Sequence, residues 1–61
     1  MDNFEVGQEV RVVGNVTLHN FPIGEVLRIT RVREDITEVK AEYLDGSDWW
    51  FLHFEEIEAN D

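Results

Sequence analysis

TEVKAEYLDGSDWWFLH, residues 37–53, is the stretch that decides the fold. Apolar and polar side chains alternate along Thr37–Leu44, and a second apolar run, WWFLH, covers Trp49–His53. A period of two indicates a strand with one buried face. Asp45 and Gly46 between the runs are typical of a tight turn, because both residues tolerate a positive φ, and the next two residues can lengthen it. The segment therefore predicts a β-hairpin.

Three further strands are predicted on either side of this hairpin. Gln8–Val13 alternates with two valines on one face, and Glu25–Arg33 is the longest candidate. Its alternation is interrupted near Leu27–Arg28, where we expect a bulge or a strong bend. A helix is the alternative there, but the β-branched residues and the missing helix cap favour a strand. A long loop, Val16–Gly24, joins these two strands, and a short last strand is centred on Ile57–Glu58.

The chain is long enough for one small domain, which we expect to span residues 1–61 with a frayed tail at 59–61. A single helical turn is predicted at Phe54–Glu56, before the last strand. The predicted fold class is all-β, a small five-stranded barrel, because closure removes the open edges that invite aggregation. The lack of cysteine excludes disulfides and thiolate zinc sites.

The order of these elements resembles that of SH3-like barrels. The residues that carry the resemblance are VGQEVRVV (6–13), the loop to FPIGEV (21–26), EVKAEYLDGSDWWF (38–51) and FEEIE (54–58). The opening looks like KOW-like and Tudor-like domains, and the aromatic strand with its acidic ending is similar to short uncharacterised phage or prophage proteins. The resemblance implies the SH3-like fold, and it implies the host cytoplasm if the chain is phage-encoded. It does not imply polyproline recognition, because VTLHNFPIG (16–24) stands where peptide-binding SH3 domains carry an ALYDY-type motif.

Charge divides the chain into two unequal parts. Residues 1–33 hold four acids and four bases, whereas residues 34–61 hold ten acids and Lys40 alone, which accounts for the net charge of −9. This balance disfavours general nucleic-acid binding and adsorption to anionic membranes. No apolar run approaches the roughly 20 residues of a membrane span, and no signal-peptide pattern opens the sequence. We therefore expect a cytoplasmic protein.

Patterns typical of catalysis and of cofactor binding are missing from the sequence. His19 and His53 lie far apart and lack the spacing of zinc motifs. Glu55 and Glu56 are adjacent, so their carboxylates point apart rather than facing a substrate across a cleft. There is no phosphate-binding loop and no nucleophile motif. We expect a protein that is not an enzyme and that binds neither a metal nor a cofactor.

Two surfaces are candidates for binding a partner protein. Neighbouring strand residues face opposite sides, so either Trp49 or Trp50 must leave the core. If Trp49 and Phe51 face inward, Trp50 and Leu52 face outward, where Trp50 lines a groove beside the long loop. The alternative is that these aromatic residues only complete the core of a very short chain. Carboxylates of the acidic half would steer the partner. The predicted partner-binding residues are Phe21, Pro22, Tyr43, Trp50, Asp48, Glu55 and Glu56.

The predicted function is a non-catalytic protein-interaction module whose partner has a basic surface. A first alternative is a phage-encoded inhibitor that presents the acidic half as a nucleic-acid mimic to a host nucleic-acid-binding enzyme. A second is weak nucleic-acid binding through Arg11, Arg28, Arg31 and Arg33, with bases stacked where aromatic residues lie beside them. Against it, we expect these arginines to pair with Glu9, Glu38 and Glu42 on neighbouring strands. A third is a structural subunit whose sheet edge adds a strand to a neighbour.

Overall fold

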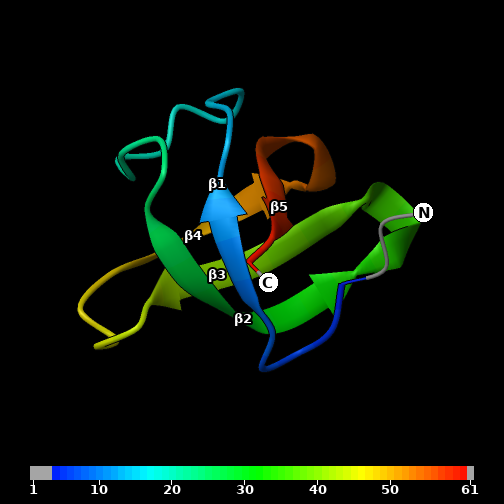
Figure 1. The fold of residues 1–61 in the computed structure, drawn as a ribbon. Helices are drawn as coiled ribbons and strands as arrows, with labels where there is room; N and C mark the ends of the chain where they lie inside the picture. Colours follow the sequence, from blue (N-terminus) through cyan, green and yellow to red (C-terminus); the bar gives the residue numbers. More distant parts are fainter. Residues whose placement is uncertain (1–3, 61) are drawn as a thin grey trace.

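A computed structural model describes residues 4–60 and shows one sheet of five antiparallel strands in the order β4-β3-β2-β1-β5 (Figure 1). The strands are β1 (Glu9–Val12), β2 (Val26–Arg33), β3 (Glu38–Tyr43), β4 (Trp49–His53) and β5 (Ile57–Ala59). Two short 3-10 turns, η1 (Glu34–Ile36) and η2 (Phe54–Glu56), are the only helical segments of the described residues. The predicted all-β class, with a helical turn before the last strand, is confirmed.

The sheet ends at two open edges, β4 and β5, which share no strand pairing. The strand pairing therefore does not establish the predicted barrel closure. Strand β5 pairs with β1, so the first and the last strand lie side by side although they are far apart in sequence. Among residues 4–60, no helix is long and apolar enough to cross a membrane.

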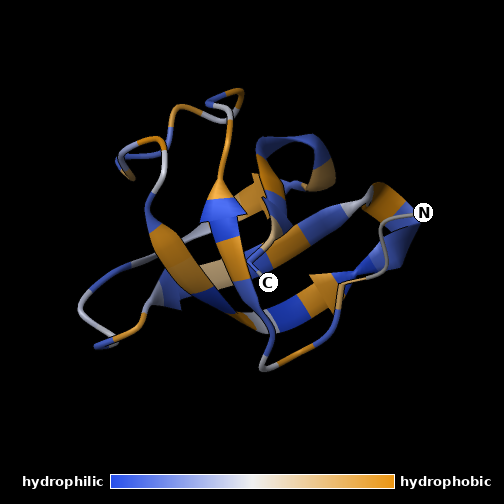
Figure 2. Ribbon diagram, in the orientation of Figure 1, coloured by the Kyte–Doolittle hydropathy of each residue, from blue (hydrophilic) through white to orange (hydrophobic). Residues whose placement is uncertain are grey.

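The core forms because each strand turns its apolar positions to the same side. In β1, Val10 and Val12 are fully buried while Glu9 and Arg11 are exposed, as predicted, and Figure 2 shows the alternation along the ribbon. Burial of each such side chain contributes about 1.5–3 kcal/mol relative to exposure. The buried apolar residues are Phe4, Val10, Val12, Phe21, Leu27, Ile29, Val39, Ala41, Leu52 and Ile57.

The irregularity predicted in β2 exists, but it lies further along the strand than Leu27–Arg28. The pairing with β3 shifts between Ile29 and Arg31, which leaves Thr30 without a partner on β3. One extra residue reverses the alternation, so Val32 still packs against the core while the arginines stay on the outer face. The bulge thus reconciles an irregular apolar pattern with a single buried side.

The predicted β3–β4 hairpin is confirmed, with a loop over Leu44–Asp48 rather than a two-residue turn. The loop closes through hydrogen bonds from Gly46 N to Tyr43 O (2.8 Å) and from Tyr43 N to Asp48 O (3.1 Å). Gly46 has a φ of 75°, which a glycine adopts without strain. Gly46 therefore provides a positive φ as the sequence indicated, whereas Asp45 does not.

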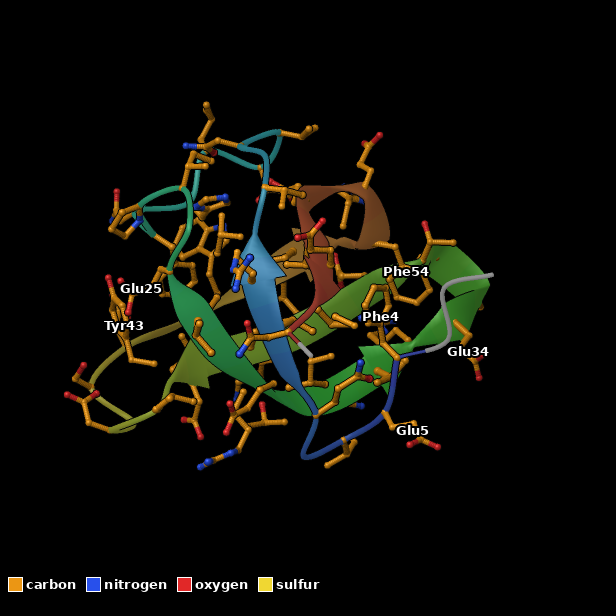
Figure 3. The ribbon with its side chains drawn as sticks, viewed as in Figure 1. Phe4, Glu5, Glu25, Glu34, Tyr43 and Phe54 are labelled. Atoms are coloured by element: carbon orange, nitrogen blue, oxygen red, sulfur yellow. The ribbon has the colours of Figure 1, made fainter. Side chains whose placement is uncertain are left out.

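The ends of the described chain are tied into the fold. Phe4 packs edge-on against Phe54, with ring centroids 5.0 Å apart, at the end of the sheet shown in Figure 3. Ala59 belongs to β5, and Asn60 N donates to Glu9 O at 3.1 Å. Residues 59–60 of the predicted tail are thus hydrogen-bonded to β1, and position 61 lies outside the described residues.

Candidate interaction surface

The structure determines the two faces of β4, which the sequence left open. Leu52 is fully buried, so Trp50, two positions earlier, shares its core-facing side, and Trp49 and Phe51 lie on the outer face. This is the opposite of the arrangement in which Trp49 and Phe51 face inward. Both indoles nevertheless remain accessible, with Trp49 47% and Trp50 41% exposed. Because β4 is an edge strand, no other strand of the sheet pairs with its open side.

Aromatic rings gather on the outer face of β4. The rings of Trp49 and Phe51 pack edge to face, with centroids 5.6 Å apart. Lys40 Nζ lies 4.3 Å from the centre of the Trp49 ring, in the geometry of a cation–π contact. The only cation in residues 34–61 therefore lies against this aromatic surface.

A surface groove of about 390 Å³ follows the open edge of β4, and we call it the β4 edge groove. Its lining includes side chains from both faces of the strand, so the groove wraps around the edge instead of lying on one face. Thr17 from the long loop and Glu38 from β3 complete it. The lining residues are Thr17, Glu38, Trp49, Trp50 and Phe51.

The backbone of an antiparallel edge strand alternates between groups that bond to the neighbouring strand and groups that point outward. Two hydrogen bonds at the ends of the hairpin set the phase of this alternation: Phe54 N to Thr37 O (2.8 Å) and Tyr43 N to Asp48 O (3.1 Å). The even positions of β4 therefore bond to β3. The backbone groups at positions 49, 51 and 53 point to the open edge.

Carboxylates cap the outward N–H groups at both ends of β4. Asp48 Oδ1 accepts from Trp49 N at 2.8 Å, and Glu56 Oε1 accepts from His53 N at 2.7 Å. Phe51 N lies between them, and within residues 4–60 it donates to no side chain and to no backbone group outside the sheet. The middle of β4 thus presents one free donor beside free carbonyl acceptors.

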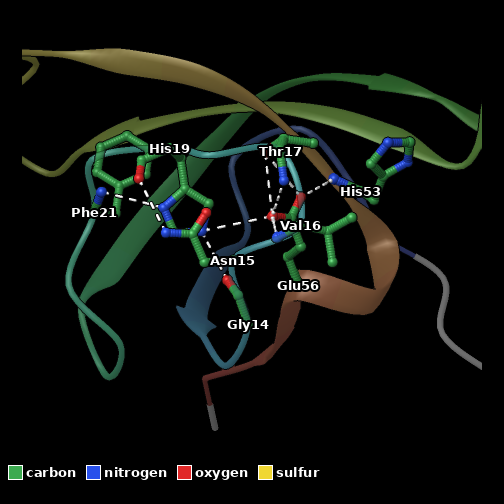
Figure 4. Close-up of polar contacts among 8 residues, drawn as sticks. All are labelled: Gly14, Asn15, Val16, Thr17, His19, Phe21, His53 and Glu56. Carbon is green, nitrogen blue, oxygen red and sulfur yellow. Dashed lines mark hydrogen bonds and ion pairs between the residues drawn. The ribbon is translucent and has the colours of Figure 1, made fainter.

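Glu56, predicted to bind a partner at the surface, is fully buried, so that prediction is wrong. Its carboxylate accepts hydrogen bonds from Val16 N (2.6 Å), Thr17 N (3.0 Å), Thr17 Oγ1 (3.1 Å) and His53 N (2.7 Å), as Figure 4 shows. These donors come from the long loop and from the end of β4. Glu56 therefore fastens the loop beside the β4 edge groove.

Burial and hydrogen bonding shift the pKa of the Glu56 carboxyl in opposite directions. Burial raises the pKa of the Glu56 carboxyl, but hydrogen bonds from Thr17, His53 and Val16 outweigh it and hold the pKa below its ordinary value. The buried His19 ring stands beside it, with Nε2 3.6 Å from Glu56 and 2.7 Å from Gly14 O.

His19 forms hydrogen bonds within the long loop. Its Nδ1 accepts from Phe21 N at 3.1 Å, which fits a neutral ring that carries its proton on Nε2. Both ring nitrogens are therefore engaged within the loop. In the part of the chain that the structure describes, no three metal-ligating side chains come together.

The predicted aromatic groove does not form. Phe21 is only 5% exposed and packs edge-on against Tyr43, with centroids 4.9 Å apart, so its predicted place at the surface is wrong. Tyr43 is half-buried and borders a separate hollow near the hairpin loop, away from the groove that Trp50 lines. Pro22, Asp48 and Glu55 are exposed, as predicted.

The arginines lie along the outer face and are mostly paired. The predicted pairing with Glu9 and Glu38 is present, and the bulge at Thr30 brings the β2 arginines to one side. Arg31 stands opposite Lys40 across the strands. Such exposed pairs are worth about 0–1 kcal/mol each. The ion pairs are Arg11–Glu58 (3.9 Å), Arg28–Glu9 (3.7 Å) and Arg33–Glu38 (3.9 Å).

Comparisons of the chain with known proteins found no match. No family model matches the sequence, and neither the curated proteins nor the solved structures contain a significant match. The functional argument therefore rests on the geometry of the chain itself.

Proposed function

We propose that this chain is a non-catalytic protein-interaction module that binds a partner protein at the β4 edge groove. The observation that carries the proposal is the cluster of Trp49, Trp50 and Phe51 around an open sheet edge, with both indoles more than two-fifths exposed. Clustered, accessible tryptophans are typical of protein-binding surfaces and of the residues that dominate binding energy there.

The charges around the groove support a partner with a basic surface. Asp48 is exposed at the start of β4, and Glu55 is exposed in η2 directly after its end. The whole chain carries a net charge of −9, so its field attracts a basic surface and repels an acidic one. Nucleic-acid binding through the arginines gains no support, because acids lie beside three of them.

The SH3-like class is part of the proposal. A long loop between β1 and β2, the strand order β4-β3-β2-β1-β5 and a 3-10 turn before β5 support it. A phage origin and a place in the host cytoplasm remain proposals that rest on the sequence resemblance alone.

The test is a comparison of proteins captured from a lysate of the source organism by the intact chain and by a Trp49→Ala/Trp50→Ala variant. We expect the variant to lose the captured partner. Its thermal midpoint should fall by only a few degrees, because both rings are half exposed.

The matched control is Ile23→Ala/Leu44→Ala, which removes two exposed apolar side chains that do not line the groove. This control should capture the same proteins as the intact chain. The proposal fails if the tryptophan variant still captures the partner, or if its midpoint collapses and thereby shows that the rings belong to the core.

A further inference from the structure

We propose that the partner supplies an extended segment with basic ends, which pairs with the open edge of β4 and adds one strand to the sheet. This inference rests on the proposed function and adds the mode of binding and the chemistry of the segment. Backbone pairing provides affinity in such strand addition, and side chains on alternate positions provide specificity.

Strand β4 lacks the lysine, proline or bulge that usually protects an edge strand from pairing. Edge strands normally carry lysine, proline or a bulge that prevents pairing with another chain. Strand β4 reads WWFLH, pairs with β3 without a register shift and contains none of these features. An unprotected aromatic edge in an otherwise highly charged chain indicates a surface kept open for pairing.

Hydrogen bonds at both ends of β4 restrict where another strand can pair with its open edge. Asp48 and Glu56 already occupy the N–H groups of Trp49 and His53. Phe51 retains both its outward N–H and its carbonyl oxygen, so an antiparallel segment can place one residue opposite Phe51 and exchange two hydrogen bonds with it. The partner register is therefore centred on Phe51.

The two faces of β4 determine which side chains the partner segment should carry. In an antiparallel pair, the residue opposite Phe51 shares its face, so it meets the Trp49–Phe51 ring pair on the outer side. The residues before and after it point to the other face, where Trp50 and Thr17 line the groove. The middle of the segment should therefore be apolar or β-branched on both faces.

The charges near the ends of β4 favour a foreign basic segment over a second copy of this chain as the occupant of the edge. A strand centred on Phe51 ends near the exposed Asp48 on one side and the exposed Glu55 on the other, so basic ends complement it. In self-pairing centred on Phe51, Glu55 of one copy lies opposite Ser47 of the other, next to Asp48. Acid would meet acid at both ends, which disfavours the second copy.

The experiment selects binders from a displayed library of random peptides of about ten residues, which is the upper length of a common strand. Enriched peptides should carry lysine or arginine at both ends around an alternating apolar centre. The strongest binder is then synthesised, together with a form in which glutamates replace its basic ends and a form that is N-methylated on its pairing edge.

Binding to the isotope-labelled chain is followed by nuclear magnetic resonance. We expect shifts along β4 and slower hydrogen exchange at Phe51 N, and we expect the glutamate form to bind about tenfold or more weakly. N-methylation should abolish binding, because it removes the donors that pair with β4. Acidic or unpatterned winners, no enrichment, or undiminished binding of the N-methylated form would each overturn strand addition.

Chain variants separate the two proposals. Asp48→Asn/Glu55→Gln keeps an acceptor for Trp49 N and should weaken the basic peptide about tenfold, whereas Glu5→Gln/Glu58→Gln, with the same charge change away from β4, should leave binding unchanged. Equal effects of both pairs would contradict end recognition. If Trp49→Ala/Trp50→Ala abolishes binding but N-methylation does not, the interaction site stands and strand addition fails. If that variant binds normally, the proposed function fails.

Pairing of β4 with a second copy of this chain would be detected as a dimer. Sedimentation of the intact chain should show a monomer. A dimer that Trp49→Ala/Trp50→Ala dissolves would assign the edge to self-pairing and overturn the foreign segment.

Discussion

At the scale of single residues, the buried carboxylate of Glu56 connects the long loop to the end of β4. A carboxylate buried without partners would be expensive, but here three backbone N–H groups and one hydroxyl surround it. Four hydrogen bonds to a charged acceptor hold Val16 and Thr17 against the end of β4. The Glu56 side chain therefore holds the Val16–Thr17 part of the long loop, and with it one wall of the β4 edge groove, in place.

Replacing Glu56 should destabilise the fold strongly. Glu56→Gln keeps the volume but loses the charge and one acceptor oxygen, so we expect the free energy of unfolding to fall by about 2–4 kcal/mol. The exposed neighbour offers a control, since Glu55→Gln should change it by less than about 0.5 kcal/mol. Urea denaturation measures both, and equal midpoints for the two variants would refute the importance of this network.

The same carboxylate should contribute to acid sensitivity. Its pKa in the folded chain lies below the ordinary value of 4.5, so the charged form stabilises the fold fully above that pH. This contribution disappears as the pH falls through the lowered folded-state pKa. The difference in unfolding free energy between the intact chain and Glu56→Gln should therefore shrink below about pH 4.5. A difference that stays constant down to acid unfolding would be inconsistent with a lowered pKa.

At the scale of elements, the bulge in β2 shows why a local pattern is ambiguous. Val26, Leu27, Ile29 and Val32 fit no single alternation, so the sequence predicts an irregularity, which we expected near Leu27–Arg28. Strand β3 alternates regularly, and pairing with it selects Thr30 as the unpaired residue. The choice is made by the partner strand.

Deleting Thr30 tests this assignment. Without the extra residue, Arg31 directly follows Ile29, so Ile29 still faces the core, Arg31 the outer face and Val32 the core, and the pairing with β3 continues without a bulge. We therefore expect the deletion to keep the dispersed amide resonances and the β-sheet circular dichroism. Deleting Arg28, which pairs with Glu42 on β3, is the contrasting variant, because it turns the buried Leu27 to the outer face and should unfold the chain. An unfolded Thr30 deletion would show that Thr30 is not the extra residue.

Strand β4 illustrates a second ambiguity. Its residues are all apolar or aromatic except the last, so neither possible phase is marked by a polar side. The buried partner Val39 on β3 determines that Leu52 faces inward. Sequence alternation predicted the strand and its bounds, but its faces depend on contact across the sheet.

Alanine substitutions can confirm the observed faces. Leu52→Ala removes a fully buried side chain and should cost about 2–5 kcal/mol, whereas Phe51→Ala should cost clearly less because the ring is only partly buried on the outer face. Thermal and urea unfolding of the two variants provide the comparison. The reverse order of stabilities would restore the opposite assignment of β4.

At the scale of the whole molecule, net charge opposes folding. Fourteen acids and five bases share a small body, and several bases are already paired with acids on the outer face. Repulsion among the remaining carboxylates is long-ranged, so salt weakens it. A high net charge favours solubility in general and opposes pairing of the aromatic edge with a second copy of the chain.

Added salt should therefore stabilise the chain. We expect the thermal midpoint to rise as sodium chloride increases toward about 0.5 M, where the Debye length is shorter than the spacing of most surface charges. Potassium chloride should have the same effect, since the cause is screening and not a specific ion. A midpoint that falls with salt would mean that the ion pairs outweigh the repulsion.

Local sequence patterns predicted the all-β class, the hairpin, the helical turn before the last strand and the outward position of most charges. These features follow from local periodicity and turn chemistry, which neighbouring residues specify. Four features emerge only when the strands pair: the residue of β2 that bulges, the buried face of β4, the burial of Glu56 and Phe21, and the open edge of β4. Each of these depends on which distant segments meet in space, because a side chain is buried only when another segment covers it.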